Sequence, residues 1–163
     1  RWTAEGIEYE ADPKHRKLIM EHFGCDEESS RLVCNGEKDW RKEEAWEEEE
    51  LPAEEATVFR GIAARANFLS LECPDLQFPV KQMSREMAKP KVGSWKRMKK
   101  IARYSVNRKT VIWQFKWQDK CRKSHTCGDS DWSGRTGSRK STSGGVWVLE
   151  HIVSRRGVLP KEL

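Results

Sequence analysis

The stretch CGDSDWSGRTGSRKSTSGGVWVLE, residues 127–150, places two aspartates around one serine and continues into a loop of small and basic residues. Asp129 and Asp131 fit three roles, which are metal ligands, a turn, or part of a solvated loop. The end of the stretch, GGVWVLE, predicts a β-strand because valines and a tryptophan follow a glycine pair. The role of the two acids decides whether the chain is an enzyme.

Further strands are expected on both sides of this stretch. Upstream, TVIWQFKWQ (residues 110–118) alternates large apolar residues with smaller or polar ones, which is typical of a strand. Downstream, HIVSRRGVLPKEL (residues 151–163) begins a third strand. Between them, KCRKSHTCG (residues 120–128) has no apolar face and predicts only a weak strand. We therefore expect an incomplete antiparallel sheet over residues 110–159, with an unpaired edge.

Helical periodicity dominates the middle of the chain. Apolar residues recur at helical spacing over residues 52–69 and again after Pro74, although Pro79 should weaken or kink that second helix. A third helix is expected to begin with Ser94 as its N-cap and to carry many basic residues. Nearer the start, GIEYEADPKHRKLIMEHFG (residues 6–24) predicts a short strand and then a helix.

Composition divides the chain into an acidic and a basic part. Residues 1–55 contain 8 Lys and Arg against 18 Asp and Glu, whereas residues 56–163 contain 23 against 8. This asymmetry favours a basic portion that faces nucleic acid and an acidic linker or electrostatic mask at residues 25–50; two independently solvated surfaces are the alternative.

Hydropathy and cysteine spacing argue against a membrane protein, a secreted protein and a disulfide-bonded or zinc-binding protein. No apolar run approaches twenty residues, so no membrane span is expected, and the first residues do not form a signal peptide. The start on Arg1 indicates a chain cut from something longer. The five cysteines are an odd number and lie far apart, which favours free thiols over disulfides or a zinc site. We expect an intracellular location, in the cytoplasm or the nucleus.

Four segments resemble, in the same order, parts of copia-like LTR retrotransposon Pol polyproteins. DSDWSGRTGSRKSTSGGV (residues 129–146) is similar to the signature at the start of their ribonuclease H domain. EEATVFRGIAARANFLSLECPDLQFPVKQMSREMAKP (residues 54–90) and SWKRMKKIARYSVNRK (residues 94–109) resemble the helical region before that domain. GIEYEADPKHRKLIMEHFG resembles the segment preceding both.

The resemblance implies an α+β fold, with a short helical, thumb-like bundle followed by a truncated ribonuclease H-like antiparallel sheet. It assigns residues 1–24 to the end of a reverse transcriptase segment. Residues 25–50, which are polar and acidic without a sustained period, are expected to be a disordered acidic linker. Residues 51–107 then form the thumb-like region, and residues 108–163 form an incomplete ribonuclease H-like domain.

The resemblance also makes Asp129 the first metal-binding acid of that domain, where the intact family uses Mg²⁺. Two magnesium ions need several carboxylates. After Asp131 the chain has only Glu150 and Glu162, and neither fits the family pattern. The reverse transcriptase catalytic segment is also absent. We therefore expect Asp129 to be vestigial and the chain to be no enzyme, with no resident cofactor.

Several positions depart from the family pattern, as a decayed or domesticated element would. Cys73 replaces an arginine, Ser105 replaces a core leucine, and Ser133 replaces an alanine. The tryptophans at 95, 113, 117 and 132 fit either base stacking or core packing, and packing is favoured at their spacing.

Basic residues of the helices and of the loop after Asp131 are candidates for phosphate contacts. The alternatives are a solvated helix face and a flexible hairpin loop. The candidates are Arg60, Arg65, Lys96, Arg97, Lys99, Lys100, Arg103, Arg135, Arg139 and Lys140.

Three functions follow from these observations. The first is an inactive remnant of a Pol polyprotein, whose partners are the rest of that polyprotein and an RNA–DNA hybrid or duplex, with no membrane. The second is a small basic nucleic-acid-binding module without catalysis. The third is an active magnesium nuclease, which requires acids from another subunit.

Overall fold

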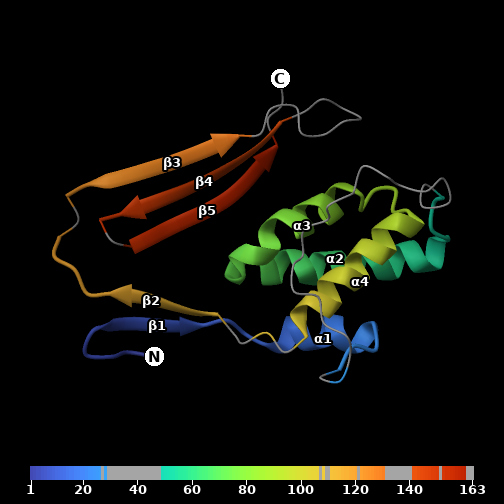
Figure 1. The fold of residues 1–163 in the computed structure, drawn as a ribbon, viewed down its shortest axis with the longest axis horizontal. Coiled ribbons are helices and arrows are strands. Elements are labelled where there is room, and N and C mark those ends of the chain that lie inside the picture. The colour runs from blue at the N-terminus through green and yellow to red at the C-terminus, as the bar shows by residue number, and fades with distance from the viewer. Residues whose placement is uncertain are drawn as a thin grey trace. The chain divides into compact units, whose positions relative to one another are not determined.

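The computed structural model describes residues 1–26, 28, 49–106, 108, 111–120, 122–130, 141–150 and 152–160, the last of these ranges by its backbone. The chain divides into two compact units (Figure 1). One is the helical unit, Ala11–Val111, and the other is the strand unit, Arg1–Glu10 with Ile112–Leu163. Most of the predicted acidic linker at residues 25–50 lies outside the described residues.

The helical unit contains α1 (Lys14–His22), α2 (Ala53–Glu72), α3 (Pro74–Arg85) and α4 (Val92–Ser105). Helix α2 packs against α1 and α3, and α4 packs against the same two helices. The four helices confirm those expected from periodicity. Pro79 lies within α3, and the helix continues past it to Arg85.

The core of this unit is formed by the apolar stripes that the sequence shows. Phe59 and Met98 are fully buried, and small residues such as Ala63 and Ala66 let neighbouring helices approach α2 closely. No described helix is long and apolar enough to cross a membrane.

The described residues of the strand unit form two antiparallel sheets. Strand β1 (Gly6–Glu10) pairs with β2 (Ile112–Lys116), while β3 (Ser124–Ser130), β4 (Thr142–Leu149) and β5 (Ile152–Pro160) form a second sheet in that order.

The expectation of one sheet over residues 110–159 is therefore wrong. Strand β2 pairs with β1, with Phe115 opposite Ile7 and Trp113 opposite Tyr9. These cross-strand pairs place apolar side chains together on one face, which favours this pairing.

The weak strand predicted near residues 120–128 is present as β3, and all seven of its residues are exposed. It is an edge strand that pairs with β4. Because it buries no apolar face, its backbone hydrogen bonds to β4 hold it in place. The predicted strand at GGVWVLE is confirmed within β4, and the third strand is confirmed as β5.

Candidate nucleic-acid interface

Helix α4 carries four basic residues at the helical spacing i, i+3, i+4 and i+7. Lys96, Lys99 and Lys100 are exposed and Arg103 is half-buried. Residues at this spacing lie on one face of a helix, and we call this set the α4 basic stripe. The opposite face of α4 is buried through Met98 and neighbouring core residues. Because α4 contains no acidic residue, the stripe is not neutralised from within its own helix.

The beginning of α4 is fixed by a polar network. The backbone N–H of Lys91 donates to Ser94 Oγ at 3.0 Å, and the Ser94 hydroxyl donates to Glu86. The helix begins at Val92, three residues earlier than predicted, so Ser94 is the third helical residue and not the N-cap that the sequence predicted. This network sets the end of α4 from which the stripe begins.

Aromatic side chains fix the same end of the helix from the core. Trp95 is half-buried, with its ring centroid 5.6 Å from that of Phe23 and 6.3 Å from that of Phe59. Trp95 therefore packs in the core, as its helical spacing favoured. At the other end, the Tyr104 hydroxyl donates to Asp75 at 2.8 Å, and the Arg108 guanidinium lies 4.2 Å from the Tyr104 ring.

Arg97 lies on α4 but not in the stripe. Its Nη2 atom is 2.9 Å from both carboxylate oxygens of Glu86, and the Arg97 and Glu86 side chains are only 17% and 25% exposed. A guanidinium held this way joins the C-terminal end of α3 to α4. We therefore assign Arg97 to the scaffold of the helical unit rather than to phosphate contact.

Arg60 is held in a similar way. Its Nε donates to the Met87 carbonyl at 2.9 Å and its Nη2 donates to the Ala88 carbonyl at 3.4 Å. These bonds join α2 to the connection that follows α3. Arg65 is exposed on α2, so it stays a candidate for phosphate contact together with the stripe.

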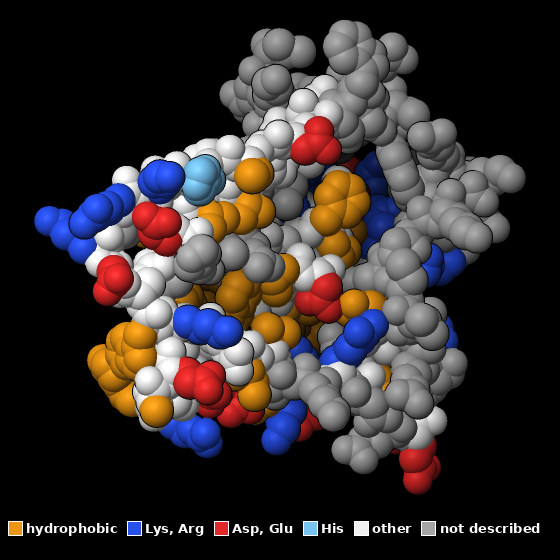
Figure 2. Space-filling view, turned by 60° about the vertical axis from the view of Figure 1, so that its left-hand side comes forward, with side chains coloured by type: hydrophobic (Ala, Val, Ile, Leu, Met, Phe, Trp, Pro, Cys, Tyr) orange, Lys and Arg blue, Asp and Glu red, His pale blue; other side chains and the backbone are white. Residues whose placement is uncertain are grey.

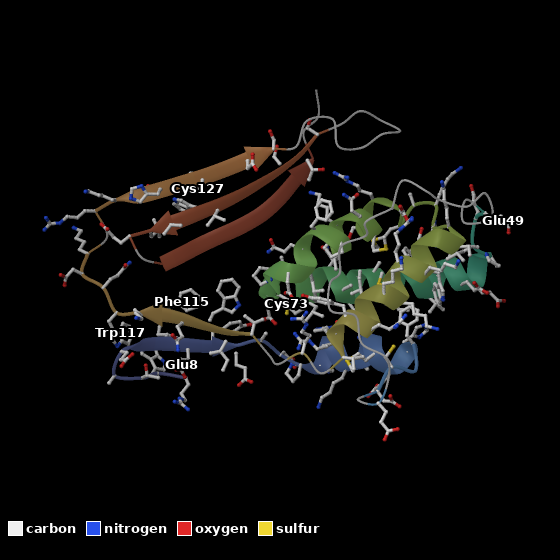
Figure 3. All side chains as sticks on the ribbon, viewed as in Figure 1. Glu8, Glu49, Cys73, Phe115, Trp117 and Cys127 are labelled. Carbon is white, nitrogen blue, oxygen red and sulfur yellow. The ribbon has the colours of Figure 1, made fainter. Side chains whose placement is uncertain are left out.

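Cys73, where the resemblance leads one to expect arginine, is buried at the junction of α2 and α3 (Figure 3). Arg16 Nη2 donates to its sulfur at 3.4 Å. Burial raises the pKa of the Cys73 thiol above 9.0, and the adjacent Arg16 guanidinium offsets only part of this effect. The cysteine is therefore a protonated core residue at neutral pH.

Asp129 lies on the exposed edge strand β3. Its Oδ1 accepts a hydrogen bond from the backbone N–H of Ser130 at 2.8 Å, and its cross-strand neighbour on β4 is Gly144. Among the described residues, no three His, Cys, Asp or Glu side chains gather at a common site. The part of the chain that the structure describes thus does not bring to Asp129 the carboxylates that two magnesium ions need.

Several predicted residues fall outside the described part of the chain. The second aspartate, Asp131, is one of them. The basic residues of the following loop also fall outside it, namely Arg135, Arg139 and Lys140. Trp132 also falls outside the described part.

Sequence reasoning missed the exposure of Trp2, and the packing that it favoured for Trp117 is wrong. Trp2 is 75% exposed, and its ring centroid lies 5.4 Å from that of Trp117, which is 51% exposed. Figure 3 labels Trp117 and Phe115 on β2 and its continuation. The Trp2 contact depends on a turn between Thr3 and Gly6, which the sequence analysis did not predict.

A comparison with curated proteins finds a similar one. The Retrovirus-related Pol polyprotein from transposon RE2 of Arabidopsis thaliana is 30% identical over 95 residues, which make up 58% of this chain. Over these 95 residues the chain is therefore similar to a retrotransposon Pol polyprotein. It spans about 6% of the length of that relative. No family model and no solved structure matches the chain.

Proposed function

We propose that the chain is a fragment of a copia-like Pol polyprotein that holds an RNA–DNA hybrid or duplex through the α4 basic stripe and does not cleave it. The observation that best supports this proposal is the row of exposed lysines at residues 96, 99 and 100, on a helix that contains no Asp or Glu. Helices of this kind track a duplex through its phosphates, which gives affinity without sequence reading. The similarity to a retrotransposon Pol polyprotein supports a nucleic-acid partner.

We propose that the chain does not cleave nucleic acid because it lacks the set of carboxylates that such a reaction needs. A two-metal phosphodiesterase site needs several carboxylates around both ions. Asp129 is exposed on an edge strand, and the later acids of the chain do not match the family pattern. The reverse transcriptase and ribonuclease H activities of the intact family therefore do not extend to this chain in our proposal.

The salt dependence of binding tests the stripe. The logarithm of the association constant falls linearly with the logarithm of the salt concentration. Each phosphate contact adds about 0.9 to the steepness of this slope, so four contacts give a slope of about 3.6 in magnitude. Affinity for a labelled hybrid should then fall about 150-fold between roughly 50 and 200 mM salt. The Lys99→Gln/Lys100→Gln variant should reduce the slope to about 1.8, with a fall of about 12-fold over the same range.

A matched variant controls for net charge. Lys14 and Lys17 are exposed on α1, and Lys14→Gln/Lys17→Gln removes the same charge from outside the stripe. Fluorescence anisotropy with a labelled hybrid measures all three proteins. Equal slopes for the two double variants would contradict a role for α4.

Cleavage is measured separately with Mg²⁺ and the same hybrid. We expect no product from the wild-type chain or from Asp129→Asn. Cleavage by the wild-type chain that disappears in Asp129→Asn would mean that the missing carboxylates are supplied, and the inactive assignment would be wrong.

A further inference from the structure

The strand unit exposes a pair of tryptophans that packing does not explain. Trp2 and Trp117 are 75% and 51% exposed, with their rings tilted by 32°. Figure 2 shows hydrophobic side chains on the surface next to Lys and Arg on one face of the molecule. Two exposed tryptophans in contact with each other form a contiguous patch of apolar surface, and contiguous patches of this kind mark interaction sites.

The pair is held in place by hydrogen bonds rather than by burial. Trp117 Nε1 donates to the Thr3 carbonyl at 3.2 Å, and the Trp117 backbone N–H donates to the Glu5 carbonyl at 2.9 Å. Thr3 in turn donates from its backbone N–H to the Gly6 carbonyl at 2.8 Å. The Trp117 indole is therefore positioned by a hydrogen bond before any ligand arrives, and the Trp2 ring lies against it, which lowers the entropy lost on binding.

The chain around Trp117 is basic. Residues 116–123 carry four Lys and Arg against one Asp. Of these, Lys116 and Lys120 are exposed on either side of Trp117 along the sequence. Aromatic residues on a basic segment match an unpaired nucleotide strand, because its bases stack on the rings while its phosphates meet the charges.

The geometry points to a second nucleic-acid contact, in which Trp2 and Trp117 form a stacking platform for the bases of a single strand. Paired bases inside a duplex cannot reach such a platform, since their faces are already stacked on their neighbours. The platform belongs to the strand unit and the α4 basic stripe to the helical unit. This inference therefore goes beyond the proposed function and can fail separately from it.

An unstructured oligonucleotide tests the platform. Fluorescence anisotropy with labelled oligo(dT) of about 15 nucleotides, long enough to cover a site of this kind, is compared with a hairpin duplex, using wild type, Trp2→Ala and Trp117→Ala. Each alanine variant should raise the Kd for oligo(dT) about fivefold or more, as loss of base stacking on one ring predicts, and leave the Kd for the duplex unchanged. Trp2→Tyr keeps a ring and should restore most of the affinity.

Trp147→Ala is the matched control, because Trp147 is 43% exposed and lies on β4. It should bind oligo(dT) like wild type. Circular dichroism of each variant establishes that the fold is retained. The proposal is overturned if wild type does not bind oligo(dT), if Trp2→Ala binds it as wild type does, or if Trp147→Ala weakens binding to the same extent.

Discussion

Replacing Arg97 should destabilise the helical unit, although the sequence alone presents it as one more surface cation. Its guanidinium is within 2.9 Å of both Glu86 oxygens, and the two side chains are largely removed from water. Arg97→Gln leaves the Glu86 carboxylate without its cation. Hydrogen bonds to charged groups are worth about 1.5–3 kcal/mol each, so the free energy of unfolding should fall by about that amount.

Thermal unfolding followed by the helical circular dichroism signal measures this effect, because all of the described helices lie between Lys14 and Ser105, within the helical unit. At about 4 °C per kcal/mol for a unit of this size, the Tm should fall by roughly 6–12 °C. Lys96→Gln, one position earlier on the same helix and exposed, should change the free energy of unfolding by less than about 0.5 kcal/mol.

A double-mutant cycle separates the ion pair from general helix effects. Glu86→Gln and Arg97→Gln together should cost less than the sum of the two single changes, since both remove the same contact. Additive costs, or an Arg97→Gln protein that melts at the wild-type temperature, would refute the assignment of Arg97 to the scaffold.

Two glycines and one cysteine give the remaining predictions. A Cβ on Gly6 would lie 2.1 Å from the Phe115 carbonyl oxygen, so Gly6→Ala should break the β1–β2 pairing and speed amide hydrogen exchange in β2. At Gly61 on α2, nothing lies within 4 Å of the position that a Cβ would take, and Gly61→Ala should raise stability by about 0.5–1 kcal/mol in urea unfolding. Because burial raises the pKa of Cys73 above 9.0, the unfolded chain loses this proton first, and stability should fall as the pH rises from about 9 through the folded-state pKa. Urea unfolding at about pH 8 and about pH 10.5 should show this fall reduced in Cys73→Ala, and an equal fall in both proteins would contradict it.

The helices could be predicted because their buried residues repeat at a local spacing. Pairing of β2 with β1 could not, since it joins residues more than a hundred positions apart and no pattern within either strand specifies its partner. The alternation in TVIWQFKWQ correctly predicted a strand but not its sheet.

The same limit applies to the candidate interface. The sequence predicted a helix here that carries many basic residues, and the lysines of the stripe are exposed on it. Spacing could not separate Arg97 from them, because its partner Glu86 comes from outside that helix, just after α3. For Arg60 the acceptors are main-chain carbonyls, which leave no signal in a sequence.

The pairing of β1 with β2 has a consequence for the order of folding. In the sequence, the two strands flank the entire helical unit, whose first and last residues, Ala11 and Val111, are themselves joined by a backbone hydrogen bond of 3.2 Å. Pairing β1 with β2 closes a loop that spans the whole helical unit, and this closure costs entropy. The helices form without this cost, because their own contacts are mostly local. We expect the helices to assemble first and bring the two strands together, so that the helical unit acts as the folding template for the sheet that presents the tryptophan platform.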